Sequence, residues 1–350
     1  MAKERLITSE STTVEESSFN LSLRPQRLAD YTGQPTLTEK LSITLQAVRA
    51  RKEPMEHVLL HGPPGLGKTT LAHIIANEMG TNLTVTAGPA LTKPGDLVGI
   101  LTKLSDGDVL FVDEIHRLQI SLEEYLYSAM EDFKIDVQID QGMHAKTITL
   151  PVKPFTLIGA TTRAGMISGP MRSRFGITHH LEFYSEDDLL AILIRSAKLM
   201  NVITDMSSGV VMEALGSIAS RSRGTPRIAN RLLRRVRDFT QVKAGGVLTS
   251  DVVDAALSLE GVDALGVDEL DRKYMSVIAQ VYNGGPVGLE AIAATLGEDA
   301  GTLEEVVEPY LLQMGFLART RKGRQLTTAG GAHIGVKIAV DQSPQQLLID

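Results

Sequence analysis

Apolar residues along the chain gather in short runs, and these runs are separated by longer stretches with helical periodicity. Candidate strands, each bounded by Gly, Pro or Asp, are His57–Leu60, Leu83–Thr86, Val109–Val112 and Phe155–Ile158. Helix-like segments such as Thr69–Met79 and Ser121–Asp132 lie between them. Apolar strands that alternate with helices are typical of a parallel sheet covered on both faces. We therefore predict an α/β domain built on a parallel sheet.

The segment from Lys134 to Leu150 departs from this rhythm, because single apolar residues alternate there with polar ones. The alternating apolar positions are Ile135, Val137, Ile139, Ile148 and Leu150, on either side of a turn region at Gln141–His144. A period of two is the signature of a strand with one buried face. We predict a β-hairpin at 134–150 that is inserted in the α/β domain.

The rest of the chain divides by pattern into further regions. Residues 1–20 are polar and predict a flexible tail, and 21–184 form the α/β domain. Residues 185–260 have a helical pattern with five arginines crowded on one helix. Residues 261–338 hold helical stretches followed by two short strands joined by a basic turn, which predicts a winged helix, and 339–350 form a second tail.

Composition narrows the class of protein. A hydrophobic fraction of 43% and a charged fraction of 22% are those of an ordinary globular protein. The chain has no cysteine, which excludes disulfides and thiolate metal sites and fits a reducing compartment. Neither a secretory signal nor a membrane-length apolar run is found in the sequence, so we expect a cytoplasmic protein with no membrane partner. The net charge of −7 requires any nucleic-acid contact to use a local basic face.

The strongest motif is the glycine-rich loop that follows the first predicted strand. It reads Gly62-Pro-Pro-Gly-Leu-Gly67-Lys68-Thr69 and leads directly into a predicted helix. Glycines allow successive backbone N–H groups to turn toward phosphates, and the helix N-terminus adds the positive end of its dipole. Lys68 is expected at the β- and γ-phosphates of ATP, and the Thr69 hydroxyl at Mg²⁺. An ordinary Gly/Pro turn is the alternative, and the strand, loop and helix in register argue against it.

Two further strands end in residues that suit the same chemistry. The predicted strand at 109–112 is followed by Asp113 and Glu114. Asp113 suits Mg²⁺ binding, and Glu114 suits polarisation of an attacking water. His116 is interpreted as a structural or switch contact, because no neighbouring residues complete a metal site. The strand at 155–158 is followed by Thr161 and Thr162, where a sensor of the γ-phosphate is expected.

Two arginines lie where they could reach a phosphate. Arg174 follows the loop that begins at Gly169, and Arg227 comes directly after Pro226 at a predicted helix start. An arginine on a loop can stabilise the charge of a transition state on a neighbouring subunit. Surface ion pairs are the alternative for the arginines of the loop that begins at Gly169, Arg172 and Arg174.

In their order and spacing, these motifs resemble the AAA+ ATPases across about 22–260. Longer matches point to one branch of that family, the bacterial RuvB Holliday-junction branch-migration motors. They include Leu23–Gln34, Ser128–Phe133, Pro170–Gly176, Gly224–Asp238, Gly284–Leu289 and Glu308–Arg319. The resemblance implies a large ATPase domain at 21–184, a helical lid at 185–260 and a winged-helix DNA-binding domain at 261–338.

The resemblance also implies roles for individual residues and partners. It puts Leu23 and Arg24 at the adenine, and Thr162, or its neighbour Thr161, at the first sensor. It makes Arg174 a finger that acts on the next subunit, Arg227 the second sensor, and Arg319 and Arg324 the DNA contacts. The residues implied around the nucleotide are Gly65, Gly67, Lys68, Thr69, Thr70, Glu131, Asp132, Phe133 and Tyr184. The implied partners are Holliday-junction DNA, RuvA at the hairpin, RuvC in a resolving complex, and identical subunits in a hexameric ring.

The wing departs from the family pattern, because Arg321 and Lys322 stand where the family usually has a proline. A basic turn suits phosphate contact without base readout. A protein-contact role for the winged helix, or a merely solvated turn, is the alternative reading of the same residues. The main alternatives for the whole chain are a clamp-loader-like switch and a protein-remodelling chaperone. The absence of an aromatic residue in the Gly88–Gly99 region weighs against the chaperone.

Overall fold

The computed structural model describes residues 23–138, 147–202 and 208–338, which fall into two compact units. The first unit holds the described residues of 23–199 together with Gly224–Arg227. The second holds the described residues of Met200–Arg223 and those from Ile228 onward. Within the described ranges, every helix is too short or too polar to cross a membrane.

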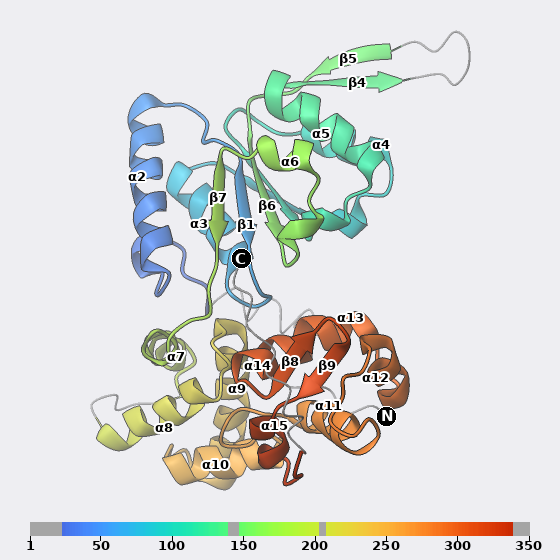
Figure 1. Cartoon of the computed structure of the whole chain (residues 1–350). Coiled ribbons are helices and arrows are strands. Elements are labelled where there is room, and N and C mark those ends of the chain that lie inside the picture. The colour runs from blue at the N-terminus through green and yellow to red at the C-terminus, as the bar shows by residue number, and fades with distance from the viewer. Residues whose placement is uncertain (1–22, 139–146, 203–207, 339–350) are drawn as a thin grey trace. The chain divides into compact units, whose positions relative to one another are not determined.

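The first unit is an α/β domain (Figure 1). Its strands are β1 Val58–His61, β2 Leu83–Ala87, β3 Val109–Asp113, β4 Lys134–Gln138, β5 Thr147–Pro151, β6 Thr156–Thr161 and β7 Ile177–His180. Its α-helices are α2 Pro35–Arg51, α3 Lys68–Met79, α4 Pro94–Leu101, α5 Ile120–Asp132, α6 Gly169–Ser173 and α7 Glu186–Leu199. Short 3-10 helices are η1 Leu28–Asp30, η2 Gly88–Ala90, η3 Ile115–Arg117 and η4 Ala164–Met166.

Five of the strands form a parallel sheet in the order β2-β3-β6-β1-β7, which confirms the predicted parallel sheet. Each of the four predicted runs becomes a strand whose bounds differ from the prediction by no more than a few residues. The fifth strand, β7, was not predicted. It lies at the edge of the sheet, and only His179 of its residues is buried, so the sequence shows no apolar run there.

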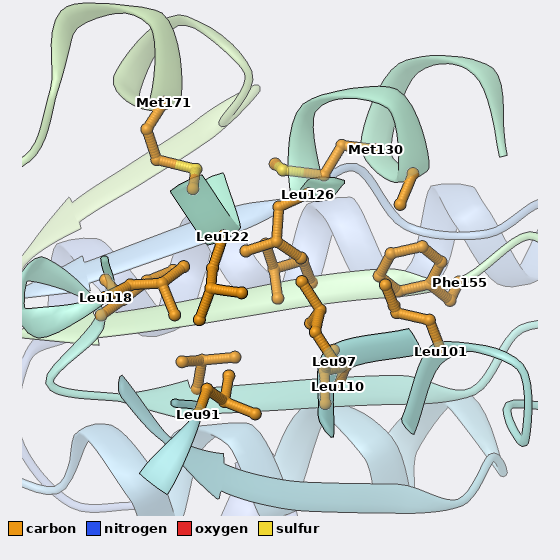
Figure 2. Packing of buried hydrophobic residues seen from close by; sticks show 14 of the residues in the cluster. Leu91, Leu97, Leu101, Leu110, Leu118, Leu122, Leu126, Met130, Phe155 and Met171 are labelled. Carbon is orange, nitrogen blue, oxygen red and sulfur yellow. The ribbon is translucent and has the colours of Figure 1, made fainter. Parts of the chain in front are cut away.

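The core of this domain follows from the strand period of two. Leu59, Leu110, Val112 and Leu157 point to one face, where they join side chains of α4 and α5 in one buried cluster. Figure 2 shows this cluster, with Leu97, Leu101, Leu122 and Leu126 packed over the strands. The intervening residues of the strands are also buried, and α3 contacts β2, β3 and β6. Helices therefore cover both faces of the sheet.

The segment predicted as a hairpin contains β4 and β5, which pair antiparallel with Ile135 opposite Leu150 and Val137 opposite Ile148. The pair projects from the end of α5 (Figure 1). Ile135, next to the domain, is buried, whereas the Ile148 side chain is 45% exposed. Ile139 and the turn region at Gln141–His144 lie outside the described residues.

The second unit combines a group of helices with a small α/β fold. Its helices are α8 Gly209–Ser220, α9 Pro226–Lys243, whose first two residues belong to the first unit, α10 Ser250–Leu259, α11 Glu269–Gln280, α12 Leu289–Leu296, α13 Ala300–Thr302, the π-helical turn η5 Leu303–Val307, α14 Glu308–Gln313 and α15 Thr328–His333. Strands β8 Leu317–Thr320 and β9 Gly323–Leu326 pair antiparallel. Three helical stretches followed by this two-stranded ribbon form a winged helix around the buried Tyr274.

A buried ion pair ties the residues before α9 to the winged helix. Arg223 Nη2 binds a carboxylate oxygen of Asp271, and Arg223 Nε donates to the Gly266 carbonyl at 2.8 Å. The guanidinium also lies 4.7 Å from the centre of the Tyr310 ring. Because a buried charge without partners is strongly destabilising, these contacts make Arg223 part of the structural core of this unit.

We expect Leu126→Ala to lower the free energy of unfolding by about 3 kcal/mol, because Leu126 is fully buried and its truncation leaves a cavity. Ile120 lies on the same helix and is 76% exposed, so Ile120→Ala should change stability by less than about 0.5 kcal/mol. Urea unfolding followed by circular dichroism measures both values. Equal losses in the two variants would contradict this description of the core.

Candidate functional site

The glycine-rich loop connects β1 to α3 and takes a conformation that requires its glycines. Gly62, Gly65 and Gly67 have φ angles of 142°, 82° and 98°. A Cβ atom on Gly62 would lie 2.5 Å from the carbonyl oxygen of Leu181, so even alanine does not fit there. The loop ends at the first turn of α3, which contains Thr69 and Thr70. The backbone N–H groups of this turn, with the helix dipole, favour an anion at this position.

Lys68 lies over the loop and is largely buried, with 7% of its surface exposed. Its Nζ donates to the carbonyl oxygens of Gly62 at 2.8 Å and Pro63 at 2.9 Å. Burial lowers the pKa of Lys68 to about 8, although Asp113 and Glu114 act in the opposite direction. The ammonium group is therefore poorly solvated, and a nearby anion would stabilise its charged form.

The acidic pair at the end of β3 is held by hydrogen bonds to the end of β6. Glu114 has a left-handed backbone with φ 47°, and its N–H donates to Asp113 Oδ1 at 3.0 Å. Glu114 Oε2 accepts a hydrogen bond from Thr162 Oγ1 at 3.2 Å and lies 3.2 Å from His116 Nδ1. The buried Thr161 Oγ1 lies 2.9 Å from the same His116 nitrogen. His116 thus connects Thr161 to Glu114, whereas Thr162 binds Glu114 directly.

A neighbouring glycine, Gly88, allows the backbone of Glu114 to take this position. A Cβ on Gly88 would lie 2.5 Å from the Glu114 carbonyl oxygen. The left-handed conformation costs a non-glycine residue about 1 kcal/mol, and such residues are often found at functional sites. The sequence had no signal for this contact, because it depends on the packing of β2 beside β3.

Two arginines add positive charge at the carboxyl-terminal ends of the strands, beside the glycine-rich loop. The pKa of Arg24 is lowered by burial and by the charge of Arg227, whereas Asp113 acts in the opposite direction. A Cβ on Gly65 would lie 3.3 Å from the Cβ of Arg227, so Arg227 comes close to the loop. Arg24, Lys68 and Arg227 are thus gathered around two carboxylates. A polyanion in this place would relieve the repulsion among the three cations.

Residues before and after the sheet brace the loop. Tyr184 Oη donates to the Leu66 carbonyl at 3.1 Å and lies 2.6 Å from Tyr31 Oη. Burial raises the pKa of Tyr31 to about 12, so this hydroxyl keeps its proton at neutral pH. Arg195 Nη1 donates to the carbonyl of the buried Leu23 at 2.8 Å, which holds the segment that carries Arg24. Neither Tyr31 nor Arg195 was predicted as a site residue.

Four of the predicted site residues lie at the amino-terminal ends of the strands, opposite the glycine-rich loop. Glu131 and Asp132 are the last residues of α5 and Phe133 follows them, and Arg174 Nη2 contacts Glu131 Oε2 at 3.1 Å. The amino ends of the strands meet here, because His57 Nε2 lies 3.1 Å from the Met130 carbonyl. The length of β1, about 13 Å at 3.3 Å per residue, separates this edge from the glycine-rich loop. The structure therefore does not bring these four residues to the loop of their own chain.

Arg174 is held in place by its surroundings. Its Nη1 donates to the Pro170 carbonyl at 2.7 Å, and its guanidinium lies 4.2 Å from the centre of the Tyr127 ring. Tyr127 Oη and Ser168 Oγ each donate to the buried Glu123 at 2.6 Å. No local pattern indicated this role for Glu123, because Tyr127 lies on the same helix α5 but Ser168 is 45 positions away in the chain.

The wing of the second unit carries the predicted DNA contacts. Arg319 on β8 and Arg324 on β9 face each other in the strand register. Their side chains are 44% and 20% exposed, and both bind Glu308. Arg321 and Lys322 form the exposed turn between the strands. The wing thus combines a paired set of arginines with a solvated basic tip.

The α/β unit has the fold and site of a P-loop ATPase: a glycine loop before a helix, a buried lysine, and an acidic pair ending the strand two positions away in the sheet. Family models agree with this class of protein along nearly all of the described chain. They match the RuvB P-loop domain at residues 23–181, the RuvB AAA lid domain at 184–263 and the RuvB C-terminal winged-helix domain at 264–335. The chain belongs to the RuvB family.

Individual relatives agree with this assignment. A Holliday junction branch migration complex subunit RuvB from Limosilactobacillus reuteri is 52% identical, over 94% of this chain and 96% of the relative. The Kosmotoga olearia protein of the same name is 53% identical over 95% of each chain. The structure of the Thermotoga maritima RuvB Holliday junction branch migration motor has 50% identity and a TM-score of 0.81, covering 91% of this chain and 100% of that one.

We expect nucleotide binding to take up a proton above pH 8, because an anion favours the charged form of Lys68, whose pKa is about 8 without ligand. Affinity should therefore fall by up to about tenfold per pH unit above 8. Calorimetric titration of ADP in two buffers of different ionisation enthalpy, at pH 7.5 and pH 9, measures the uptake. The exposed Lys52→Ala should behave like the unaltered protein. Equal proton uptake at both pH values would contradict the lowered pKa.

Proposed function

We propose that this chain is the ATP-hydrolysing subunit of a motor that moves the branch point of Holliday junctions in DNA recombination and repair. The observation that carries the proposal is the joint presence, on one chain, of a complete P-loop site and a winged helix with a basic wing. The named relatives match over 94% and 95% of the chain, so both parts are included in the likeness.

In this proposal ATP is the nucleotide and Mg²⁺ its metal. The Thr69 hydroxyl and Asp113 would hold Mg²⁺, which offsets charge on the phosphates. Within the described residues no cluster of three or more acidic or histidine side chains forms a cage for a metal. That is the pattern expected for Mg²⁺, which usually binds through one or two side chains together with substrate phosphates and water.

Hydrolysis would use the residues that converge on the loop. Glu114 accepts a proton from the attacking water, whose oxygen bonds to the γ-phosphorus while the bond to the bridging oxygen of ADP breaks. Thr162 and His116 hold the Glu114 carboxylate in position. Lys68 offsets charge on the β- and γ-phosphates, and Arg227 approaches from the start of α9. Leu23 and Arg24 would lie at the adenine, and Tyr184, which binds the Leu66 carbonyl of the loop, would lie beside the nucleotide.

A second subunit would complete the site. Arg174 lies with Glu131 at the edge of the sheet away from its own loop, so we propose that it acts on the nucleotide of a neighbour in a hexameric ring. Glu131, Asp132 and Phe133 would border the same neighbouring nucleotide. The Glu123 network around Tyr127 keeps Arg174 oriented before the subunits meet.

The remaining partners are proposed from the hairpin and the wing. RuvA would dock on the hairpin at 134–150, whose Ile148 is 45% exposed. Arg319 and Arg324 would contact DNA phosphates, and RuvC would join the complex that resolves the junction. The motor would work in the cytoplasm.

The test is ATP turnover with and without four-way junction DNA and RuvA, together with dissociation of the junction. We expect turnover to rise with DNA, and branch movement to require both ATP and RuvA. Glu114→Gln should bind ATP but lose at least about a hundredfold in turnover, since it removes the general base. Turnover that ignores DNA but responds to an unfolded protein would favour a protein-remodelling function.

We expect Arg174→Ala to keep nucleotide binding and to lose hydrolysis by about a thousandfold, because a finger arginine acts only in the transition state. If it acts on a neighbour, mixing the variant with unaltered protein should inhibit activity more than dilution does. Arg117→Ala, at an exposed arginine of the same unit, is the control and should leave the mixture unaffected. A linear decrease with the fraction of variant would contradict action between subunits.

A further inference from the structure

A fully buried carboxylate lies beneath the two wing arginines. Glu308, the first residue of α14, is 0% exposed. Its Oε1 accepts hydrogen bonds from Tyr274 Oη at 2.6 Å and Arg324 Nε at 2.9 Å. Its Oε2 accepts from Arg319 Nε at 2.8 Å and from Arg319 Nη2. One carboxylate therefore holds side chains from α11, β8 and β9.

This arrangement offsets the repulsion between the two arginines of the wing. Arg319 and Arg324 are direct cross-strand partners, and like charges in that relation repel each other. Glu308 supplies a negative charge between them, and Glu304 Oε1 lies 3.7 Å from each guanidinium. The buried carboxylate needs these donors in turn, since an unpaired buried charge is strongly destabilising.

The contacts also fix the direction in which each guanidinium faces. Both arginines bind Glu308 through the edge that carries Nε, with Nη2 of each also directed at the carboxylate. A guanidinium is planar, so its remaining edge, with Nη1, points away from Glu308. Because Arg319 is 44% exposed and Arg324 20% exposed, solvent reaches both side chains. These outer edges can donate to phosphate oxygens.

We propose that Glu308 is the positioning residue of the wing, which orients Arg319 and Arg324 for DNA phosphates before DNA arrives. The proposal rests on the proposed DNA contact of these two arginines. Long side chains lose conformational entropy when a ligand immobilises them, and side chains that are already held lose less. Tyr274 belongs to the same device, because burial and the hydrogen bond to Glu308 raise the pKa of its hydroxyl, which stays protonated as a donor.

A purely electrostatic role for Glu308 makes the opposite prediction. Glu308→Gln removes one negative charge from beneath the wing, so electrostatics alone would tighten DNA binding. Loss of positioning would weaken it, because an amide nitrogen would replace one of the two oxygens that accept from the arginines. The exposed tip residues Arg321 and Lys322 have no ion pair within the described part of the chain, so their attraction for DNA does not depend on Glu308.

The test is a double-mutant cycle on the affinity of the full chain for a linear duplex, measured by fluorescence anisotropy at fixed salt. The proteins compared are unaltered chain, Glu308→Gln, Arg319→Ala with Arg324→Ala, and all three changes together. Glu298→Gln is the matched control, because it removes the same charge from an exposed position of the same unit. Circular dichroism checks that each variant is folded.

We expect Glu308→Gln to weaken duplex binding about fivefold and Glu298→Gln to change it by less than about twofold. In the background without the two arginines, Glu308→Gln should cause no further loss. Unchanged or tighter binding by Glu308→Gln, or equal losses in both backgrounds, would overturn the positioning role while leaving the DNA contact intact. Unchanged binding after loss of both arginines would instead overturn the DNA contact and the inference with it.

If Glu308→Gln does not fold, Glu308→Asp takes its place in the same cycle. Aspartate keeps the charge but withdraws the carboxylate by one methylene group, so it cannot hold both arginines in the same geometry. We expect the same loss of affinity, and again only in the background that contains both arginines. Affinity equal to that of the unaltered chain would show that charge alone matters and would overturn the proposal.

Discussion

The parallel register of β3, β6 and β1 is the constraint on which the nucleotide site depends. These strands are neighbours in the sheet, and each is buried up to the point where a polar residue or the glycine loop begins. Lys68, the acidic pair at the end of β3 and the threonines at the end of β6 therefore meet at the carboxyl-terminal ends of the strands. A shift of one residue in any strand would turn its buried side chains to the opposite face and separate these groups.

Burial of the cations around the glycine-rich loop favours the binding of an anion there. Arg227 is close enough to repel both Arg24 and Lys68, and desolvation lowers the pKa of both Arg24 and Lys68. The carboxylates of Asp113 and Glu114 offset this only in part. A phosphate chain is the kind of ligand that balances such a site, because it brings several negative charges to preorganised cations and backbone donors. The free energy stored in the charges of the folded chain thus favours nucleotide binding.

Two buried glutamates serve the same purpose at separate places in the chain. Glu123 accepts hydrogen bonds from Tyr127 and Ser168, and the Tyr127 ring supports Arg174. Glu308 holds Arg319 and Arg324 directly. In each case a buried carboxylate restricts an arginine that we propose acts on a phosphate outside its own domain. Orienting the guanidinium in advance reduces the entropy lost when the phosphate arrives.

The sequence by itself determined those parts of the nucleotide site that depend on neighbouring residues in the chain. Three such features are encoded within a few neighbouring residues. They are the glycine spacing before Lys68, the apolar runs that end in Asp113 and Thr161, and Pro226 at the start of α9. Only the tertiary structure decided the edge strand β7, the pairing of Tyr31 with Tyr184, and the support of the arginines by buried glutamates. Tyr31 and Tyr184 are 153 positions apart in the chain. Such contacts arise from packing between distant elements, and no local pattern of residues encodes them.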